Sequence, residues 1–244
     1  MLHRTIAAAL VGLATAPAAV AQDWQGQFTI YGWLPAIAGE QEREDGRPLV
    51  EISTKDVLEA LDFAFFASGE VRRGKFGALF DMSYARLSSS GDVDRPVRAS
   101  ADVKTTVAFA QAAASWRFYE TEPRRFAEAY AGIRAYDTEA SFDVSVGPFS
   151  GGRKASSNWV DPIIGLRGSF PLSERWSVSA LGDVGGFDAA SDLSWELYGG
   201  ANYAFNEHFS GVLGYRYMSI THEDDDLSLD INIYGPLVGV TYRF

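Results

Sequence analysis

The chain of 244 residues contains no cysteine. This absence excludes a disulfide scaffold, a thiolate metal site and a cysteine nucleophile. Basic residues are also scarce, because 21 Lys and Arg stand against 32 Asp and Glu, for a net charge of -11. Such a balance argues against a nucleic-acid-binding protein, which needs a basic face to neutralise phosphates. We therefore expect no nucleic-acid partner.

Long hydrophobic runs are missing except at the N-terminus. Arg4 precedes an apolar stretch over residues 6–20, and residues 19–21 read Ala-Val-Ala, a typical cleavage site. The stretch is shorter than the ~20 residues of a membrane-spanning helix. It therefore predicts a secretory signal peptide over residues 1–21. Residues 22–244 then form one exported domain that either is soluble or crosses a membrane as strands.

Short runs with an apolar residue at every second position fill the rest of the chain. Side chains alternate between the two faces of a strand, so this period predicts β-structure. Short turns alternate with long polar segments as the connections between these runs, which is the layout of an outer-membrane barrel. We expect a short helix near residues 54–61, capped by Thr54. About ten strands are expected, with eight or twelve as alternatives, near residues 26–38, 61–72, 75–87, 103–118, 125–137, 158–170, 175–187, 193–205, 208–220 and 228–244.

Three features favour an all-β, antiparallel transmembrane barrel over a soluble sandwich. The chain ends on an alternating strand that carries Tyr242 and Phe244, which resembles the insertion signal of bacterial outer-membrane proteins. Many Trp and Tyr residues lie near predicted strand ends, as in interfacial girdles. Charges also fall inside predicted strands, where a small barrel would direct them into its lumen: Glu70, Asp81, Glu128, Arg134, Asp161, Arg167, Asp183, Glu196 and Arg216.

The last predicted strand changes phase near Tyr234, Gly235 and Pro236. Apolar residues occupy odd positions before this point and even positions after it. A β-bulge would explain the change, since Pro cannot donate to the ladder.

Several segments resemble a family of Gram-negative outer-membrane β-barrel proteins. The resemblance covers nearly all of the exported part and implies a single barrel domain over residues 22–244. It brings no activity, because the family has no assigned reaction, and it transfers no catalytic residue. The segments are YGWLPAIAG at 31–39, LDFAF at 61–65, EVRRGK at 70–75, WVDPIIGLRG at 159–168, GDVGGF at 182–187, LGYRY at 213–217 and GPLVG at 235–239.

Residues suited to catalysis are few. His222, beside the acidic run at 223–226, is the one histidine with the surroundings of a general base, and it suggests a hydrolase at the outer rim as one hypothesis. The acidic run has several oxygen ligands for Ca²⁺ but lacks the usual loop pattern, so a solvated loop is the simpler interpretation. We predict no catalytic residue, cofactor or metal.

The nine strand charges carry the functional interpretation. Six acids face three arginines, and buried charges must pair to avoid a large desolvation cost. The leading hypothesis is a non-enzymatic envelope or surface protein of the bacterial outer membrane with a largely closed lumen. A narrow, cation-preferring channel for ions or small solutes is the alternative. The expected partners are outer-membrane lipid, lipopolysaccharide and the barrel-insertion machinery.

Overall fold

The computed structural model describes residues 24–39, 51–93, 99–147, 149–224 and 227–244. The predicted signal peptide lies outside these ranges and stays a prediction. Twelve strands and one helix follow one another along the described ranges: β1 (Trp24–Trp33), β2 (Ala36–Gly39), β3 (Glu51–Ile52), α1 (Thr54–Ala60), β4 (Leu61–Arg73), β5 (Phe76–Val93), β6 (Ala99–Glu122), β7 (Arg125–Val146), β8 (Phe149–Pro171), β9 (Trp176–Gly186), β10 (Leu193–Ala204), β11 (Phe209–Asp224) and β12 (Leu227–Arg243).

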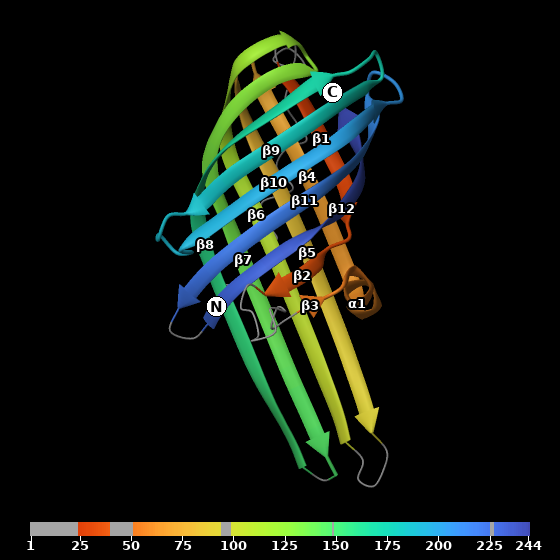
Figure 1. Cartoon of the computed structure of the whole chain (residues 1–244), viewed down its shortest axis with the longest axis vertical. Helices are drawn as coiled ribbons and strands as arrows, with labels where there is room; N and C mark the ends of the chain where they lie inside the picture. The colour runs from red at the N-terminus through yellow and green to blue at the C-terminus, as the bar shows by residue number, and fades with distance from the viewer. Residues whose placement is uncertain (1–23, 40–50, 94–98, 148, 225–226) are drawn as a thin grey trace, which may run out of the picture.

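Ten of the strands form one closed antiparallel barrel, which confirms the predicted fold and strand number. The order is β1-β4-β5-β6-β7-β8-β9-β10-β11-β12, and pairing of β1 with β12 closes the wall. Short turns join the strands at one end, where β1 begins and β12 finishes (Figure 1). We call this the turn end. The remaining two strands, β2 and β3, lie beside β12 outside the ring.

The helix α1 lies where the sequence predicts one, but its cap is different. Ser53, and not Thr54, is the N-cap residue: its hydroxyl accepts a hydrogen bond from the Asp56 amide, and the Asp56 carboxylate accepts one from the Ser53 amide. This reciprocal pair satisfies two N–H groups that the first helical turn leaves free. Across the described ranges, the model contains no helix with the length and apolarity needed to span a bilayer.

The predicted bulge in β12 is wrong. The register between β11 and β12 is continuous, and the odd residues of β12 from Ile231 to Arg243 face inward. The neighbour across β12 does change, from β1 to β2, because Pro35 interrupts that edge while Leu34 donates to the Pro236 carbonyl at 3.0 Å. What changes near Gly235 is therefore the chemistry of each face, and not the direction of the side chains.

Two segments predicted as long polar loops are strand instead. Residues 88–102 and 138–158 mostly extend β5, β6, β7 and β8, which run well past the other strands as a four-stranded sheet (Figure 1). We call this sheet the arm and define it as residues 88–93, 99–107, 138–146 and 149–158. Its pairing stays in register to the tips, with Val146 opposite Phe149 and Ala99 opposite Val146.

The wall has two zones with opposite polarity. Near the turn end its outside is apolar, with Leu197, Leu213 and Val240 more than half exposed, and its inside is charged. Towards the arm the inside is apolar, as Phe109 and Tyr136 are buried there, and the outside carries more polar side chains, among them Asp137, Glu139 and Asn158. The apparent phase change of β12 marks the boundary between these zones.

Candidate functional site: the charged lumen

All nine charges singled out in the sequence lie on the inward face of the wall. Their positions alternate with exposed neighbours, so strand parity alone directs them into the lumen. Eight of them take part in ion pairs that cross the barrel. The exception is Asp161, whose carboxylate accepts hydrogen bonds from the Ser191 amide at 2.9 Å and the Ser194 hydroxyl at 3.3 Å.

The first group of charges, the turn-end cluster, consists of Glu70, Arg72, Arg117, Glu128 and Arg167. Glu128 is fully buried and accepts hydrogen bonds from all three guanidinium groups, with Arg117 Nε at 3.2 Å and Arg167 Nε at 2.5 Å. Glu70 also pairs with all three arginines, and Arg167 reaches it at 2.5 Å. The cluster links β4, β6, β7 and β8 across one end of the lumen.

The second group, the central cluster, consists of Asp81, Arg134, Asp183, Glu196 and Arg216. Arg134 donates to Asp183 at 2.7 Å and to Glu196 at 2.8 Å, and Arg216 donates to the same Glu196 at 3.0 Å. Arg216 also meets Asp81 at 3.3 Å, so five strands are joined across the lumen.

Neutral side chains complete the central cluster. Tyr31 donates to Asp81 at 2.9 Å, Tyr130 donates to Asp183 at 2.8 Å, and the Gln111 amide oxygen accepts from Arg134 at 2.7 Å. These bonds satisfy charges that are removed from water, which a buried ion pair requires in order not to be destabilising.

Sequence reasoning missed two arginines of the lumen. Arg72 and Arg117 share strand parity with Glu70 and Gln111, so the signal was present in the alternation. Their inclusion changes the count from six acids against three arginines to six against five. The excess of negative charge that supports a cation-selective pore is therefore much smaller than the sequence suggested.

Aromatic and aliphatic side chains close the lumen beyond the central cluster. We call them the aromatic layer. Tyr136 stacks on Trp159 at 4.8 Å, and the Arg216 guanidinium lies 5.0 Å above the Trp33 ring. All members are buried: Trp33, Phe66, Phe109, Tyr136, Trp159, Met218, Ile220 and Ile233.

His222 belongs to this layer and not to an exposed rim. Its ring stacks on Trp159 at 4.3 Å with an interplanar angle of 3°, and its Nδ1 lies 2.9 Å from the Ala190 carbonyl. The acidic run beside it extends over residues 225–226, which lie outside the described residues. Elsewhere in the described ranges, no three His, Asp or Glu side chains are grouped as metal ligands.

A cavity of about 240 Å³, the lumen cavity, lies between the turn end and the central cluster. Hydroxyl and amide groups from β1, β8, β9, β10 and β12 line it together with apolar side chains; the polar groups include Thr29, Ser169, Ser179, Asn202 and Thr241. It reaches Arg124 and Arg243 at the turn end, and Glu196 and Arg216 at its other end. Beyond that point the aromatic layer follows.

Comparison with known proteins identifies the fold. No family model matches the chain, and no curated protein matches it. Among solved structures, the outer membrane protease OmpT from Escherichia coli aligns with a TM-score of 0.55 and 11% identity over 91% of this chain and 97% of OmpT. The translocator domain of the autotransporter NalP from Neisseria meningitidis aligns with a TM-score of 0.48 and 15% identity over 91% of this chain and 88% of the NalP chain. The chain thus has the fold of an outer-membrane β-barrel.

Proposed function

We propose that this chain is an integral outer-membrane protein whose barrel is closed and serves as an anchor for a surface-interacting arm. The observation that carries this proposal is the closure of the lumen by the central cluster and then by the aromatic layer. The turn-end cluster fills one side of the lumen before them. A ten-stranded barrel is narrow enough for its side chains to fill most of the interior. A filled interior favours a structural or binding role over transport.

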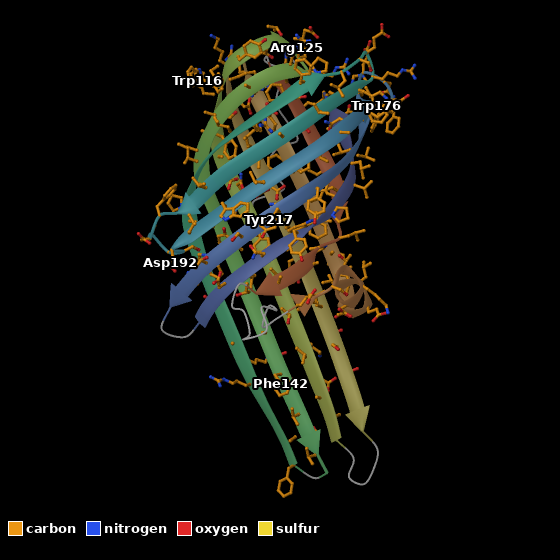
Figure 2. The ribbon with its side chains drawn as sticks, in the orientation of Figure 1. Trp116, Arg125, Phe142, Trp176, Asp192 and Tyr217 are labelled. Atoms are coloured by element: carbon orange, nitrogen blue, oxygen red, sulfur yellow. The ribbon has the colours of Figure 1, made fainter. Side chains whose placement is uncertain are left out.

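The outer surface supports a membrane position. Trp195, Tyr217 and Tyr234 form one stacked row, with ring centroids 4.9 Å and 5.6 Å apart. Tyr203 lies eight residues after Trp195 on β10, and Tyr242 eight after Tyr234 on β12. Eight residues span about 27 Å along a strand, which a tilt of about 40° reduces to about 20 Å, close to the apolar band of such barrels. Figure 2 shows Trp116 and Trp176 at the turn end and Tyr217 near mid-height.

This position implies an orientation and a set of partners. Bacterial barrels keep short turns in the periplasm and longer connections outside. The turn end then faces the periplasm and the arm leaves the cell surface. Lipid and lipopolysaccharide surround the apolar band, and the barrel-insertion machinery recognises the last strand through Tyr242 and Phe244.

We propose a non-enzymatic role. The stacking of His222 on Trp159 and its bond to Ala190 support this, because a general base must reach its substrate within hydrogen-bond distance. If the intact protein hydrolysed lipid or peptide substrates and His222→Ala did not, the rim hydrolase would be established instead.

Conductance of the refolded barrel in a planar bilayer tests the closed lumen. Heat-modifiable migration on a gel first establishes that the barrel is folded. We expect no discrete conductance steps from the unaltered protein. A double variant, Trp33→Ala with Arg216→Ala, removes the ring and the guanidinium that stacks on it, and we expect it to conduct. Arg153→Ala, on the arm, is the control and should stay silent.

Stable cation-selective steps from the unaltered protein would overturn the closed lumen. They would favour the narrow channel, in which the inward acids attract cations. Glu196→Gln should then lower the selectivity for cations, because Glu196 lines the lumen cavity.

A further inference from the structure

The arm carries side chains of different kinds on its two faces. Phe109, Tyr136 and Trp159 are buried in the lumen, and the strands continue from them without a register shift into the arm. Residues of the same parity therefore form the inner face. Apart from Arg153, most of them are apolar or small, among them Ala101, Val103, Ala140, Phe142, Val144, Val146, Phe149, Gly151 and Ala155. The outer face carries charged and hydroxyl groups, among them Asp102, Lys104, Glu139, Asp143 and Lys154.

The inner face of the arm is only partly covered. Phe142 is 49% exposed and Phe149 is 78% exposed, although both lie on the face that is buried further down the same strands. Figure 2 shows Phe142 on the arm, far from the packed part of the barrel. Exposed apolar surface of this kind marks a place where another molecule binds.

One edge of the arm is a free strand edge. β8 pairs with β7 from Phe149 to Ser169, but β9 pairs with β8 only from Ile163 onward. The turn that holds Ser191 covers Trp159 and Asp161. In the described part of the chain, residues 149–158 therefore have no strand on the side away from β7. About half of their N–H and C=O groups point to that side.

This edge is open to an added strand of the right charge. Protected edges are short, bulged, interrupted by proline or charged; residues 149–158 are regular strand without proline, and their protection consists of two positive charges, Arg153 and Lys154, which disfavour strands other than acidic ones. On the inner face, β8 contributes the small residues Gly151 and Ala155, and the Cβ position of Gly151 has no atom within 4 Å. An added strand thus has room for larger apolar side chains beside Phe142 and Val144.

The edge also has a charge of its own. Residues 149–158 contain Arg153 and Lys154 and no acid, in a chain with a net charge of -11. Both side chains are exposed, Arg153 on the inner face and Lys154 on the outer face. An acidic partner is therefore attracted locally to this edge, while the rest of the molecule repels it.

We propose that residues 149–158 of β8 bind an extended acidic polypeptide segment, which adds to the arm as a fifth strand. Main-chain hydrogen bonds to β8 supply affinity, and alternate apolar side chains of the segment extend the inner face. Acidic side chains of the segment lie on the outer face, where they pair with Lys154. The inference rests on the surface role proposed above, because it requires the arm to be accessible to other molecules.

Binding of a labelled peptide to the full-length barrel in detergent micelles tests the proposal. The probe has about eight residues and alternates valine with glutamate; fluorescence anisotropy measures its affinity. We expect it to bind more tightly than a peptide of the same composition with all valines in one block. Methylation of its alternate amide nitrogens should abolish binding, because it removes the donors that face β8.

A matched pair of variants locates the site. Lys154 and Lys104 both lie on the outer face in one row of the sheet, since each pairs with Ser141. Lys154→Glu should lower the affinity for the valine–glutamate peptide about fivefold, which corresponds to about 1 kcal/mol from an exposed charge. The same variant should raise the affinity for a valine–lysine peptide. Lys104→Glu, two strands from the edge, should change either affinity by less than about twofold.

Several results would overturn the proposal. They are equal binding of the alternating and blocked peptides, equal effects of the two lysine variants, or no binding at all. Concentration-dependent association of the barrel itself, abolished in Lys154→Glu, would instead identify a second copy as the occupant. None of these results alters the conductance or the gel migration of the barrel, so a failure here is distinguishable from a failure of the closed, membrane-inserted barrel.

Discussion

Glu128 illustrates how a single residue holds the lumen together. It is fully buried on β7, and three arginines from three other strands converge on it. Each of these guanidinium groups would be left with fewer partners if the carboxylate were lost. At the scale of residues, the stability of the barrel therefore depends on a few shared acids more than on the number of ion pairs.

Glu128→Gln should lower the free energy of unfolding by about 3–5 kcal/mol, the cost of leaving buried charge uncompensated. Urea unfolding in micelles, followed by tryptophan fluorescence, measures the loss. The control is Glu120→Gln, because Glu120 also pairs with Arg117 at 2.6 Å but is 38% exposed. In this control the free energy of unfolding should fall by less than about 1 kcal/mol. Similar losses in the two variants would contradict the central role of Glu128.

Strand parity predicted which charged residues face inward, because a strand offers only two faces. It did not predict which charges meet. The pairing of Arg134 with Glu196 joins β7 to β10, two strands that are not neighbours in the wall. Contacts across a lumen depend on the radius and tilt of the closed barrel. The spacing of residues along one strand determines neither of them. The hydrogen bond from Tyr31 to Asp81 was missed for the same reason.

At the scale of elements, the strands of the barrel wall were predictable and their continuations in the arm were not. The alternation at β9, β10 and β11 contrasts large apolar residues with polar ones. In the arm the contrast is weaker, because Ala, Ser, Gly and Val dominate residues 138–158, and glycine and serine are also typical of loops. Only the pairing of four strands with one another makes this segment regular.

The helix α1 gives a pH-dependent prediction. Hydrogen bonds from Ser53 hold the pKa of the Asp56 carboxyl below its usual range. The contribution of this cap is therefore present above the unfolded pKa and is lost as pH falls through the lower folded pKa. We expect the amide of Val57, which donates to the Ser53 carbonyl, to lose protection from hydrogen exchange in that acidic range.

A pair of substitutions checks this assignment of the cap. Ser53→Ala should reduce the protection of the Val57 amide at neutral pH and weaken its dependence on acidic pH, because only the backbone hydrogen bond from residue 53 to Asp56 remains. Thr54→Ala should leave both nearly unchanged, because the hydroxyl of Thr54 does not form the cap. The opposite ranking would restore Thr54 as the N-cap residue.

At the scale of the whole molecule, the two zones of the wall divide the protein between environments. Where the outside is apolar and girdled by aromatic rings, charged side chains fill the lumen. Where the outside is polar, apolar side chains fill it. Within the sequence of β12 alone, apolar residues change from odd to even positions, and a bulge is the local explanation. The inversion itself becomes visible only when all strands are placed around one axis.

Assembly in the outer membrane gives a prediction at the same scale. Phe244 exchanges two main-chain hydrogen bonds of 3.0 Å with Gly26 beside the barrel seam, and its ring is 65% exposed. If the insertion machinery recognises it, Phe244→Ser should reduce the folded protein in outer-membrane fractions to a minor share, while refolding in micelles stays efficient. Phe205→Ser, in a turn with a ring 59% exposed, should assemble normally. Equal assembly of both variants would remove Phe244 from the signal.

The β1–β12 seam has a mechanical consequence. Between β4 and β12 each strand of the wall pairs with its neighbours in the chain, whereas residues 27–33 meet residues 237–243 across more than 200 positions. A force applied to Phe244 is therefore borne by this seam and by the pairing of β12 with β11. Once the seam parts, the wall is an open ribbon whose hairpins peel away in reverse chain order. The arm comes late in that order, so it keeps its shape after much of the barrel has been pulled apart.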